Sequence, residues 1–458
     1  MNETGRRSAV RRRVSPTAVL AVLLPLLTVG ALALVRPDVL ATPDRAPEQV
    51  SPSWVDLVCP SGPDGSEVAL SASGRAAGDV SSFSPGDIDP SPISLVADAV
   101  ETVASPEATF VRGNGRIAAE LIGARIDEQE MTATECVLPR PEYWITGIGA
   151  GADHATSLEL SNPDEGPAVA DITVWGRTGQ LEVPTLRGVT VPGGESQVLD
   201  LAEVLPRRSE LAIHVAVSRG RMAAAALDEV PALGSRPAAT AWLPPVTEPA
   251  TEQLLLGLVG GEGTDTLVLS NPGADEARIE IRVVTEDAAF VPQGQEEIRV
   301  SPESVETVTL TETLREQVRE GALALQVTST APVTAALRSI IDDDLVHAPT
   351  VTGTESPVTA LVPAGDAELV LAMAGGAGVA VVSAYGDGEL LAEDRVELTD
   401  GSGGTIDLPE GTDLVRVSPR RTDVTASVVV TGREGATVVP LRELVRYALI
   451  PDVRPGLS

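Results

Sequence analysis

The sequence predicts an all-β protein, a string of immunoglobulin-like β-sandwich modules that follows a single N-terminal transmembrane helix. Three observations support this prediction. A strand-like segment occurs twice, as TSLELSNP at residues 156–163 and as DTLVLSNP at residues 265–272. Apolar and polar residues alternate over short runs separated by Gly, Pro, Asp and Ser, as in β-sandwiches. Aromatic residues are only 2% of the chain, so each core must consist largely of Val, Leu, Ile and Ala.

A β-propeller is the alternative fold, because each module could hold two blades. The chain shows no repeated blade signature, and its low aromatic content favours the sandwich. Its 458 residues allow three to four domains at ~100 to 200 residues each.

The first two predicted elements are a cytoplasmic Arg-rich segment at residues 1–16 and a transmembrane signal-anchor at residues 17–35. No charged residue occurs from Val14 to Val35, a stretch long enough to cross ~30 Å of hydrocarbon as a helix. Several arginines precede it, and the positive-inside rule places this end in the cytoplasm. We therefore expect a single-pass cell-membrane protein whose C-terminal part is extracytoplasmic.

A cleaved signal peptide is the competing interpretation, since an A-x-A pattern lies at residues 31–33. The apolar stretch exceeds the roughly 7–15 residues usual for a signal peptide, which favours the anchor. Both interpretations export the rest of the chain, and cleavage would make it a secreted protein. Residues 36–52, rich in Pro and charge, predict an extended tether.

The first β module is predicted at residues 53–140, and it contains the chain's only two cysteines, Cys59 and Cys136. Neither cysteine belongs to a CxxC or Cys/His cluster, which argues against zinc and against redox catalysis. An even pair in an exported chain indicates one disulfide. Two buried free thiols are the alternative.

The second and third β modules are predicted at residues 141–245 and 246–356, as two copies of one unit. The offset that brings the LSNP strings together also aligns VPGGESQVLDL at residues 191–201 with VSPESVETVTL at residues 300–310. Leucines at the same offset continue the match, so the two copies share one strand order.

The fourth β module is predicted at residues 357–447, with a tail at residues 448–458. AELVLAMAG at residues 367–375 matches the start of the repeat, with Met-Ala in place of Asn-Pro. Helical spacing of apolar residues is confined to residues 95–103 and to residues 441–449.

A short closing segment also recurs at the ends of modules. It ends on a proline each time and is otherwise mostly apolar. It is ATECVLP at residues 133–139, ATAWLP at residues 239–244 and ATVVP at residues 436–440.

The charge balance and the missing motifs limit the functions that the chain can have. A net charge of −33 with no Lys nearly excludes nucleic-acid binding, because the basic footprint is missing. The sequence contains no GxSxG, P-loop, HExxH or EF-hand pattern. We therefore predict no catalytic residue, no cofactor and no metal ligand. The triplet Asp342–Asp344 could bind Ca²⁺ weakly, but a solvated loop is the simpler interpretation.

Two asparagines occupy equivalent positions in the repeat. Asn162 and Asn271 each precede a proline at the end of a predicted strand. Asn can hydrogen-bond its own downstream backbone, and Pro fixes φ in a turn, so we expect a structural role at a strand exit. A repeated carbohydrate-binding Asn is the functional alternative.

Tryptophan and histidine are the remaining residues that could carry a function. Trp144 and Trp242 lie near module junctions, where they should fill the interface between consecutive sandwiches; stacking on sugar rings is the alternative. The histidines, His154, His214 and His347, do not converge in the sequence. His214 alternates with apolar neighbours on a strand, so we expect it to face solvent or a module interface.

A family resemblance accompanies these features. The N-terminal anchor, Cys59-Pro60, Cys136 before Pro139, the string EYW at residues 142–144 and LSNP at residues 160–163 resemble the actinobacterial domain of unknown function 5719 family. The resemblance covers the chain from about residue 15. It implies an exported, envelope-associated protein with no assigned activity, and it suggests a large membrane glycosyltransferase among the candidate partners.

We expect a non-enzymatic, membrane-anchored scaffold or interaction protein of the cell envelope, acting outside the cytoplasm. Its partner would be an envelope or membrane protein, and the membrane itself would be contacted through the N-terminal helix. The alternative is a protein that binds or processes cell-wall glycan, because two carboxylates suffice for glycoside hydrolysis. Buried tryptophans would favour the scaffold, and an exposed tryptophan beside two carboxylates would favour the alternative.

Overall fold

The computed structural model describes residues 16–34 and 48–450, except residues 75, 88, 235, 236, 295, 373 and 445. The chain divides into two compact units. One unit holds both chain ends, up to Val50 and from Ala448 onward, and the other runs from Ser51 to Tyr447.

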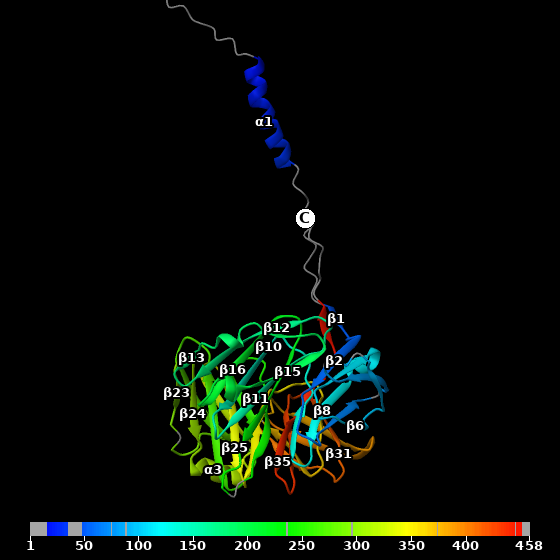
Figure 1. Ribbon diagram of the computed structural model, residues 1–458, viewed down its shortest axis with the longest axis vertical. Helices are drawn as coiled ribbons and strands as arrows, with labels where there is room; N and C mark the ends of the chain where they lie inside the picture. The colour runs from blue at the N-terminus through cyan, green and yellow to red at the C-terminus, as the bar shows by residue number, and fades with distance from the viewer. Residues whose placement is uncertain are drawn as a thin grey trace, which may run out of the picture. The chain divides into compact units, whose positions relative to one another are not determined.

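The unit that holds the chain ends contains one helix and one pair of strands. Helix α1 spans Pro16–Leu34 and includes Pro25, so it coincides with most of the predicted membrane segment (Figure 1). Residues 1–15 and 35–47, which include most of the predicted cytoplasmic segment and tether, lie outside the described residues. Within the described part of the chain, no helix meets the length and apolarity needed to span a membrane. Strand β1 (Glu48–Val50) pairs antiparallel with β37 (Ala448–Ile450).

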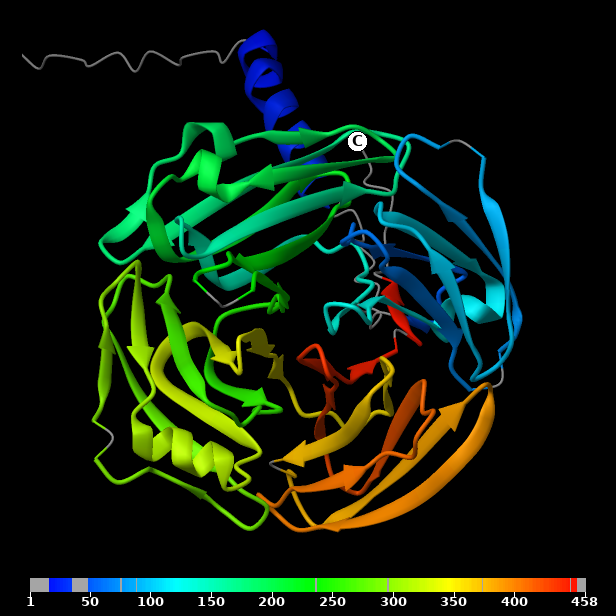
Figure 2. The same ribbon diagram turned by 60° about the horizontal axis from the view of Figure 1, so that its bottom comes forward.

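The larger unit consists of four β-sandwich modules, so the predicted fold class is confirmed. In each module two layers of antiparallel strands enclose one apolar cluster. Figure 2 shows the modules, coloured in turn blue to cyan, green, yellow-green and orange, around a common centre. The arrangement is similar to the blades of a propeller, but each module is a two-layered sandwich rather than two separate blades. The module limits predicted from the repeat remain predictions.

Module 1 has two four-stranded sheets that pack face to face. The first sheet has the order β2 (Trp54–Cys59), β7 (Thr109–Asn114), β4 (Gly78–Phe83), β5 (Ser91–Leu95). The second has the order β6 (Val100–Ala104), β3 (Glu67–Ala72), β8 (Leu121–Asp127), β9 (Thr132–Glu135). A 3₁₀ turn at Gly115–Ala119 follows β7.

Module 2 is one nine-stranded sheet that folds over at the β10–β11 hairpin, where a single residue pair joins the two halves. One layer has the order β13 (Gly179–Leu181), β12 (Ala168–Gly176), β16 (Arg208–Arg219), β10 (Glu142–Ala150), with β14 (Val189–Val191) beside β12. The other has the order β15 (Glu195–Asp200), β11 (Ala155–Asn162), β17 (Ala223–Val230), β18 (Ala239–Leu243). A 3₁₀ turn, Pro184–Leu186, and helix α2, Leu201–Val204, complete it.

Module 3 repeats this plan around one long strand, β25 (Ala324–Ile341), which runs from one layer into the other. One layer has the order β22 (Ala289–Phe290), β21 (Ala277–Val284), β25, β19 (Ala250–Leu256), β27 (Thr350–Val351), with β23 (Ile298–Val300) beside β21. The other has the order β24 (Ser304–Thr309), β20 (Gly263–Asn271), β25, β26 (Asp344–Ala348).

Module 4 has a five-stranded and a four-stranded sheet. The larger has the order β31 (Glu389–Leu398), β30 (Gly378–Gly386), β33 (Leu414–Arg420), β28 (Val358–Leu361), β36 (Arg442–Glu443). The smaller has the order β32 (Gly404–Asp407), β29 (Asp366–Ala372), β34 (Thr425–Thr431), β35 (Ala436–Pro440).

The recurring closing segments form the innermost strands of the modules. Three of these strands are β9, β18 and β35, and β26 takes the equivalent place in module 3. Each is the edge strand of its layer, and neighbouring ones contact each other in the order β9, β18, β26, β35 and back to β9. The repeated sequence therefore marks the strands that meet at the centre of the ring.

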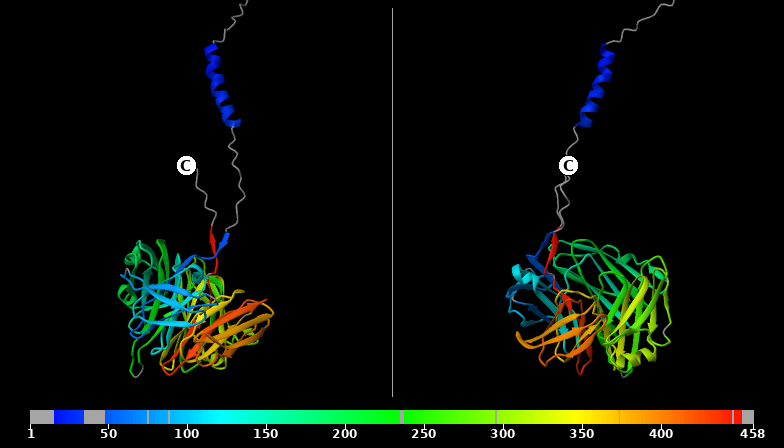
Figure 3. Two further views of the ribbon diagram at one scale, coloured as in Figure 1. Left: turned by 90° about the vertical axis from the view of Figure 1, so that its right-hand side faces the viewer. Right: turned by 180° about the vertical axis from the view of Figure 1, so that it is seen from behind.

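Each module also packs on its neighbours through apolar residues, and modules 1 and 4 close the ring. Ala69 and Ala124 of module 1 lie in one buried cluster with Leu361 and Leu414 of module 4. Figure 3 shows these two modules side by side, the first in blue and the last in orange. Similar mixed clusters join modules 1 and 2, modules 2 and 3, and modules 3 and 4.

The local helix predictions were wrong. Residues 95–103 contain the end of β5 and the start of β6, which pairs with β3. Residues 441–449 contain β36 and part of β37. Short apolar runs do not distinguish a helix from a strand, and here pairing with a neighbouring strand decided the outcome.

Helix α3 (Glu312–Arg319) was missed by the sequence analysis, although it carries two helix signals. The Thr311 hydroxyl accepts a hydrogen bond from the Leu314 amide, which caps the helix start. Leu314 and Val318, four residues apart, are both buried. A capping residue followed by apolar residues four positions apart is a helix signal. It was overlooked because the surrounding repeat consists mostly of strands.

Candidate functional site

The repeated asparagines have the structural role that the sequence predicted. The Asn162 amide nitrogen donates to three backbone carbonyls, those of Gly166, Val191 and Pro192, and its oxygen accepts from the Asp164 amide. Asn271, its counterpart in the next copy, makes the same four bonds, to Asp275, Val300, Ser301 and Gly273. Both side chains are fully buried. They fasten the turn after β11 and β20, and no part of them faces solvent to bind carbohydrate.

The predicted disulfide is confirmed: Cys59 is bonded to Cys136. Cys59 ends β2 in the first sheet of module 1, and Cys136 follows β9 in the second sheet. The bridge therefore joins the two layers of the sandwich. Both cysteines are buried within the module 1 core.

The two tryptophans lie at junctions, as predicted. The Trp144 ring stacks on Trp175 at 5.3 Å and on His214 at 4.0 Å between ring centroids. This stack packs against Val268 and Val305 of module 3. Trp242 is buried on the inner strand β18, where it borders a small cavity that residues of all four modules line.

Two of the three histidines meet at a carboxylate that the sequence analysis did not identify. Asp228 of module 2 is fully buried, and both its oxygens are engaged. His154 Nε2 lies 2.6 Å from one oxygen, and His347 Nε2 of module 3 lies 2.9 Å from the other. The Thr156 hydroxyl also donates to Asp228, at 2.8 Å. The loop at residue 154 and strand β26 are thus joined through one aspartate.

The cluster extends to a second ion pair across the same junction. Arg338 of module 3 lies 2.5 Å from His154 Nδ1 and 2.7 Å from Glu210 Oε1 of module 2. Arginine only donates hydrogen bonds, so Nδ1 of His154 accepts and the ring proton sits on Nε2, facing Asp228. We name the set of Asp228, His154, His347, Arg338 and Glu210 the junction cluster.

Burial and hydrogen bonding together set the protonation states of Asp228 and His347. Burial alone would raise the pKa of Asp228, but hydrogen bonds from His154 and His347 outweigh it and hold that pKa well below its usual range. Burial lowers the pKa of His347, although the bond to Asp228 acts in the opposite direction. The stable state is therefore an aspartate anion beside a neutral His347.

The third histidine and the acidic triplet have separate positions. His214 Nε2 lies 2.9 Å from Glu142 at the surface of the tryptophan stack. Asp342 and Asp343 form the turn between β25 and β26, where both have positive φ. Asp344 is half-buried, and one of its oxygens accepts a hydrogen bond from the Ala436 amide of module 4. Burial raises the pKa of Asp344 to about 6.

The triplet is therefore a turn that contacts module 4 rather than a solvated loop alone. Among the residues that the structure describes, no group of three or more His, Cys, Asp or Glu side chains is arranged to hold a metal ion.

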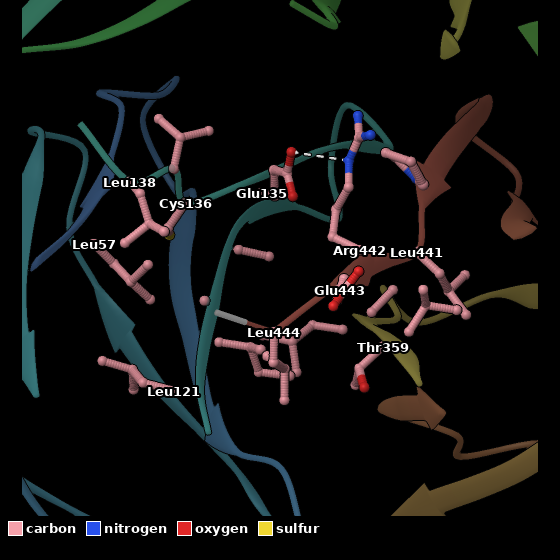
Figure 4. A pocket seen from close by; sticks show the side chains of 18 of the residues that line it. Leu57, Leu121, Glu135, Cys136, Leu138, Thr359, Leu441, Arg442, Glu443 and Leu444 are labelled. Carbon is pink, nitrogen blue, oxygen red and sulfur yellow. Dashed lines mark hydrogen bonds and ion pairs between the residues drawn. The ribbon is translucent and has the colours of Figure 1, made fainter. Parts of the chain in front are cut away.

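An open pocket of about 420 Å³ lies between module 1 and module 4 (Figure 4). Its walls are part apolar and part polar, and the apolar part includes Leu57 and Leu121 from module 1 and Leu441 and Leu444 from module 4. Charged groups lie at one side of it, where Arg442 Nε is 3.2 Å from Glu135. Sequence reasoning missed this pocket, because the two walls come from the first and the last module and meet only when the ring closes.

The geometry defines a class of protein: a closed ring of four β-sandwiches in which buried polar clusters join the modules. The chain belongs to the family of unknown function DUF5719, whose model matches residues 123–409. The match runs from β8 of module 1 into module 4, and it confirms the resemblance found in the sequence.

Other comparisons add little. A search of curated proteins gives no match. A solved structure described as "Crystal structure of tetra-tandem repeat in extending region of large adhesion protein" is 10% identical over 87% of this chain and the whole of that chain, with a TM-score of 0.11. At that TM-score the likeness does not bear on fold or function.

Proposed function

We propose that the chain is a non-enzymatic scaffold of the cell envelope, held at the membrane by residues 17–35, with the ring outside the cytoplasm. The uncharged segment and the arginines before it support this placement. The ring would offer its faces to a membrane or envelope protein. Four sandwiches that each pack on their neighbours form a more rigid platform than four domains joined by flexible linkers.

The observation that carries the proposal is that the junction cluster is buried between modules 2 and 3 and joins them. It brings two histidines and an aspartate together, yet Asp228 and His347 are both buried. Both oxygens of Asp228 are taken up by histidines from two modules. A catalytic acid or base must reach its substrate, so these side chains are suited to joining modules and not to catalysis.

The glycan alternative receives no support from the two tryptophans on which it depended. Trp144 is stacked between Trp175 and His214, and Trp242 is buried at the centre. Sugar stacking requires an open ring face.

The test is site-specific photo-crosslinking of the full chain in cells. A benzophenone amino acid would replace an exposed residue of the ring, Leu233 in module 2 or Leu390 in module 4, which are 67% and 52% exposed. A scaffold should give a discrete adduct with one protein of the membrane fraction. At a temperature where the variant Asp228→Asn is still folded, it should give the same adduct, because the cluster does no chemistry.

Two results would contradict the proposal. One is that neither position gives a protein adduct. The other is turnover of an envelope glycan by the purified chain that Asp228→Asn abolishes while the melting temperature stays unchanged.

A further inference from the structure

The lining of the pocket between modules 1 and 4 is part apolar and part polar, and leucines of both modules form its apolar part. Leu57, Leu121, Leu441 and Leu444 are each less than 9% exposed. Figure 4 shows Leu57 and Leu121 at the left, Leu441 at the right and Leu444 between them. A volume of about 420 Å³ falls within the roughly 300–1,000 Å³ of small-molecule sites, which are mostly apolar with a few polar groups at fixed positions.

The charged groups at the rim are unequally satisfied. Glu135 pairs with Arg442 Nε, and Glu443 accepts a hydrogen bond from the Thr354 hydroxyl at 3.1 Å. Arg140 also lines the pocket and is half-buried. Within the described residues, no hydrogen bond or ion pair reaches its guanidinium group. The pocket is therefore lined by two arginines with free donors: the guanidinium group of Arg140 and the terminal NH₂ groups of Arg442 make no bond to the described residues.

Several exposed arginines, such as Arg116 and Arg395, make no ion pair with the residues that the structure describes, but a half-buried arginine whose guanidinium group has no partner among them is unexpected in this chain. Acidic residues outnumber basic ones two to one, 66 against 33, and many other arginines of the ring meet a carboxylate, as Arg112, Arg221 and Arg416 do. A guanidinium binds carboxylate or phosphate through paired N–H donors. Arg140 and Arg442 at one rim thus form a place for an anionic group.

We propose that this pocket binds a single-chain anionic amphiphile, with its alkyl chain against the leucines and its carboxylate or phosphate head on Arg140 and Arg442. Burial of the chain supplies the attraction, because the net charge of −33 repels anions at long range. The two arginines then select for the charged head. The inference rests on the pocket alone and does not require the scaffold function to be correct.

The experiment is photoaffinity labelling of the full chain in lipid nanodiscs. Three probes share one diazirine-bearing ten-carbon chain and differ in the head, which is phosphate, carboxylate or the neutral glucoside. Mass spectrometry of peptides then locates the adducts. We expect the charged probes to label peptides that contain Leu121 or Leu444, and unlabelled decyl phosphate or decanoate to compete. The better competitor distinguishes a phosphate from a carboxylate ligand.

Variants at the rim test the role of charge. Arg140→Gln should lower pocket labelling by the charged probes at least tenfold and leave labelling by the neutral probe unchanged. Arg140→Lys should retain most of the labelling, which also shows that the substituted rim still folds. Arg420→Gln, which removes an exposed arginine elsewhere in module 4, is the matched control and should have no effect.

Three outcomes would overturn the inference. One is that neither charged probe gives adducts in the pocket peptides. Another is equal labelling of those peptides by the neutral probe. The last is an equal loss of labelling in Arg140→Gln and Arg420→Gln. None of these outcomes bears on the protein adduct expected of a scaffold, so the two proposals fail separately.

Discussion

Thr156 donates a hydrogen bond to Asp228 in module 2, and in module 3 the directly equivalent pair has the acid and the hydroxyl exchanged. There Asp265, which takes the place of Thr156 in the repeat, accepts from the Ser339 hydroxyl at 2.5 Å. Each pair faces directly across two neighbouring strands. Module 2 thereby has its carboxylate on β17, where it reaches His347 of module 3. Because the acid and the hydroxyl have exchanged strands between the two copies, only module 2 has a carboxylate at the position that contacts His347.

Removing that carboxylate should destabilise the ring more than removing a surface one. Asp228→Ala leaves His154, His347 and Thr156 without their acceptor in a buried site, and we expect a loss of about 3–5 kcal/mol. Glu142→Ala removes the half-exposed partner of His214 and should cost at most about 1 kcal/mol. Urea unfolding followed by circular dichroism measures both, and equal losses would show that the junction cluster contributes nothing special.

His347 should make the ring sensitive to mild acid. Its pKa is lowered by burial in the folded chain, so below about pH 6.5 the unfolded chain binds a proton that the folded chain does not. Stability should therefore fall as pH falls below about 6.5. The aspartate adds a separate loss at lower pH, below the ordinary carboxyl range, because its folded pKa is depressed.

The variant His347→Gln removes this titration while keeping a donor for Asp228. Thermal melts between pH 5 and 7.5 should show a smaller pH dependence than the parent chain. His214→Gln serves as the control and should retain the parent's dependence. An unchanged slope in His347→Gln would assign the effect to another group.

Asp344 should behave in the opposite sense. Burial raises its pKa to about 6, so the folded chain binds a proton that the unfolded chain has lost between about pH 4 and pH 6. Stability from this group falls as pH rises through that window. Asp344→Asn, which keeps an oxygen to accept from the Ala436 amide, should raise the melting temperature at pH 7.5 and have little effect at pH 4. A lower melting temperature at pH 7.5 would contradict this assignment.

The repeated asparagines should be among the most sensitive polar residues of modules 2 and 3. Asn162→Ala or Asn271→Ala leaves three carbonyls without a donor, at about 1–3 kcal/mol for each group that stays buried and unsatisfied. Asn114→Ala, an exposed position at the end of β7, should change stability by no more than about 0.5 kcal/mol. Denaturant midpoints compare the three, and a tolerant Asn162 would return the carbohydrate interpretation to consideration.

The disulfide should stabilise module 1 chiefly through the unfolded chain. It closes a separation of 77 residues, and the chain-entropy model gives about 4 kcal/mol for a loop of that length. Replacing both Cys59 and Cys136 by Ala should shift unfolding of module 1 to lower denaturant. A reducing agent should do the same to the parent chain and nothing to the variant. Equal midpoints with and without reductant in the parent would exclude a stabilising bridge.

The sequence was a good guide to what repeats locally. The LSNP strings predicted both the strands β11 and β20 and the role of their asparagines, because the bonds of Asn162 run to backbone nearby in the repeat. The disulfide followed from there being only two cysteines in the chain. These features depend on short-range geometry or on counting.

The sequence was a poor guide to what joins the modules. His154 and His347 lie in different modules, and nothing in their neighbourhoods indicates a shared aspartate. Arg140 and Leu444 meet at one pocket only because module 4 returns to module 1. Each contact depends on how whole sandwiches pack against one another. The alternation of apolar and polar residues predicts strands but not this packing.

Closure of the ring also fixes an order of events during synthesis. Ala69 packs against Leu361 and Leu414, which leave the ribosome only after modules 2 and 3 have emerged. Until then an apolar face of module 1 has no cover, and β1 has no strand to pair with before residues 448–450 emerge. Exposed apolar surface and unpaired edges favour aggregation. A chain that stalls or is cut within module 4 is therefore left with open faces at both of its ends, which makes completion of the last module the step that protects all the others.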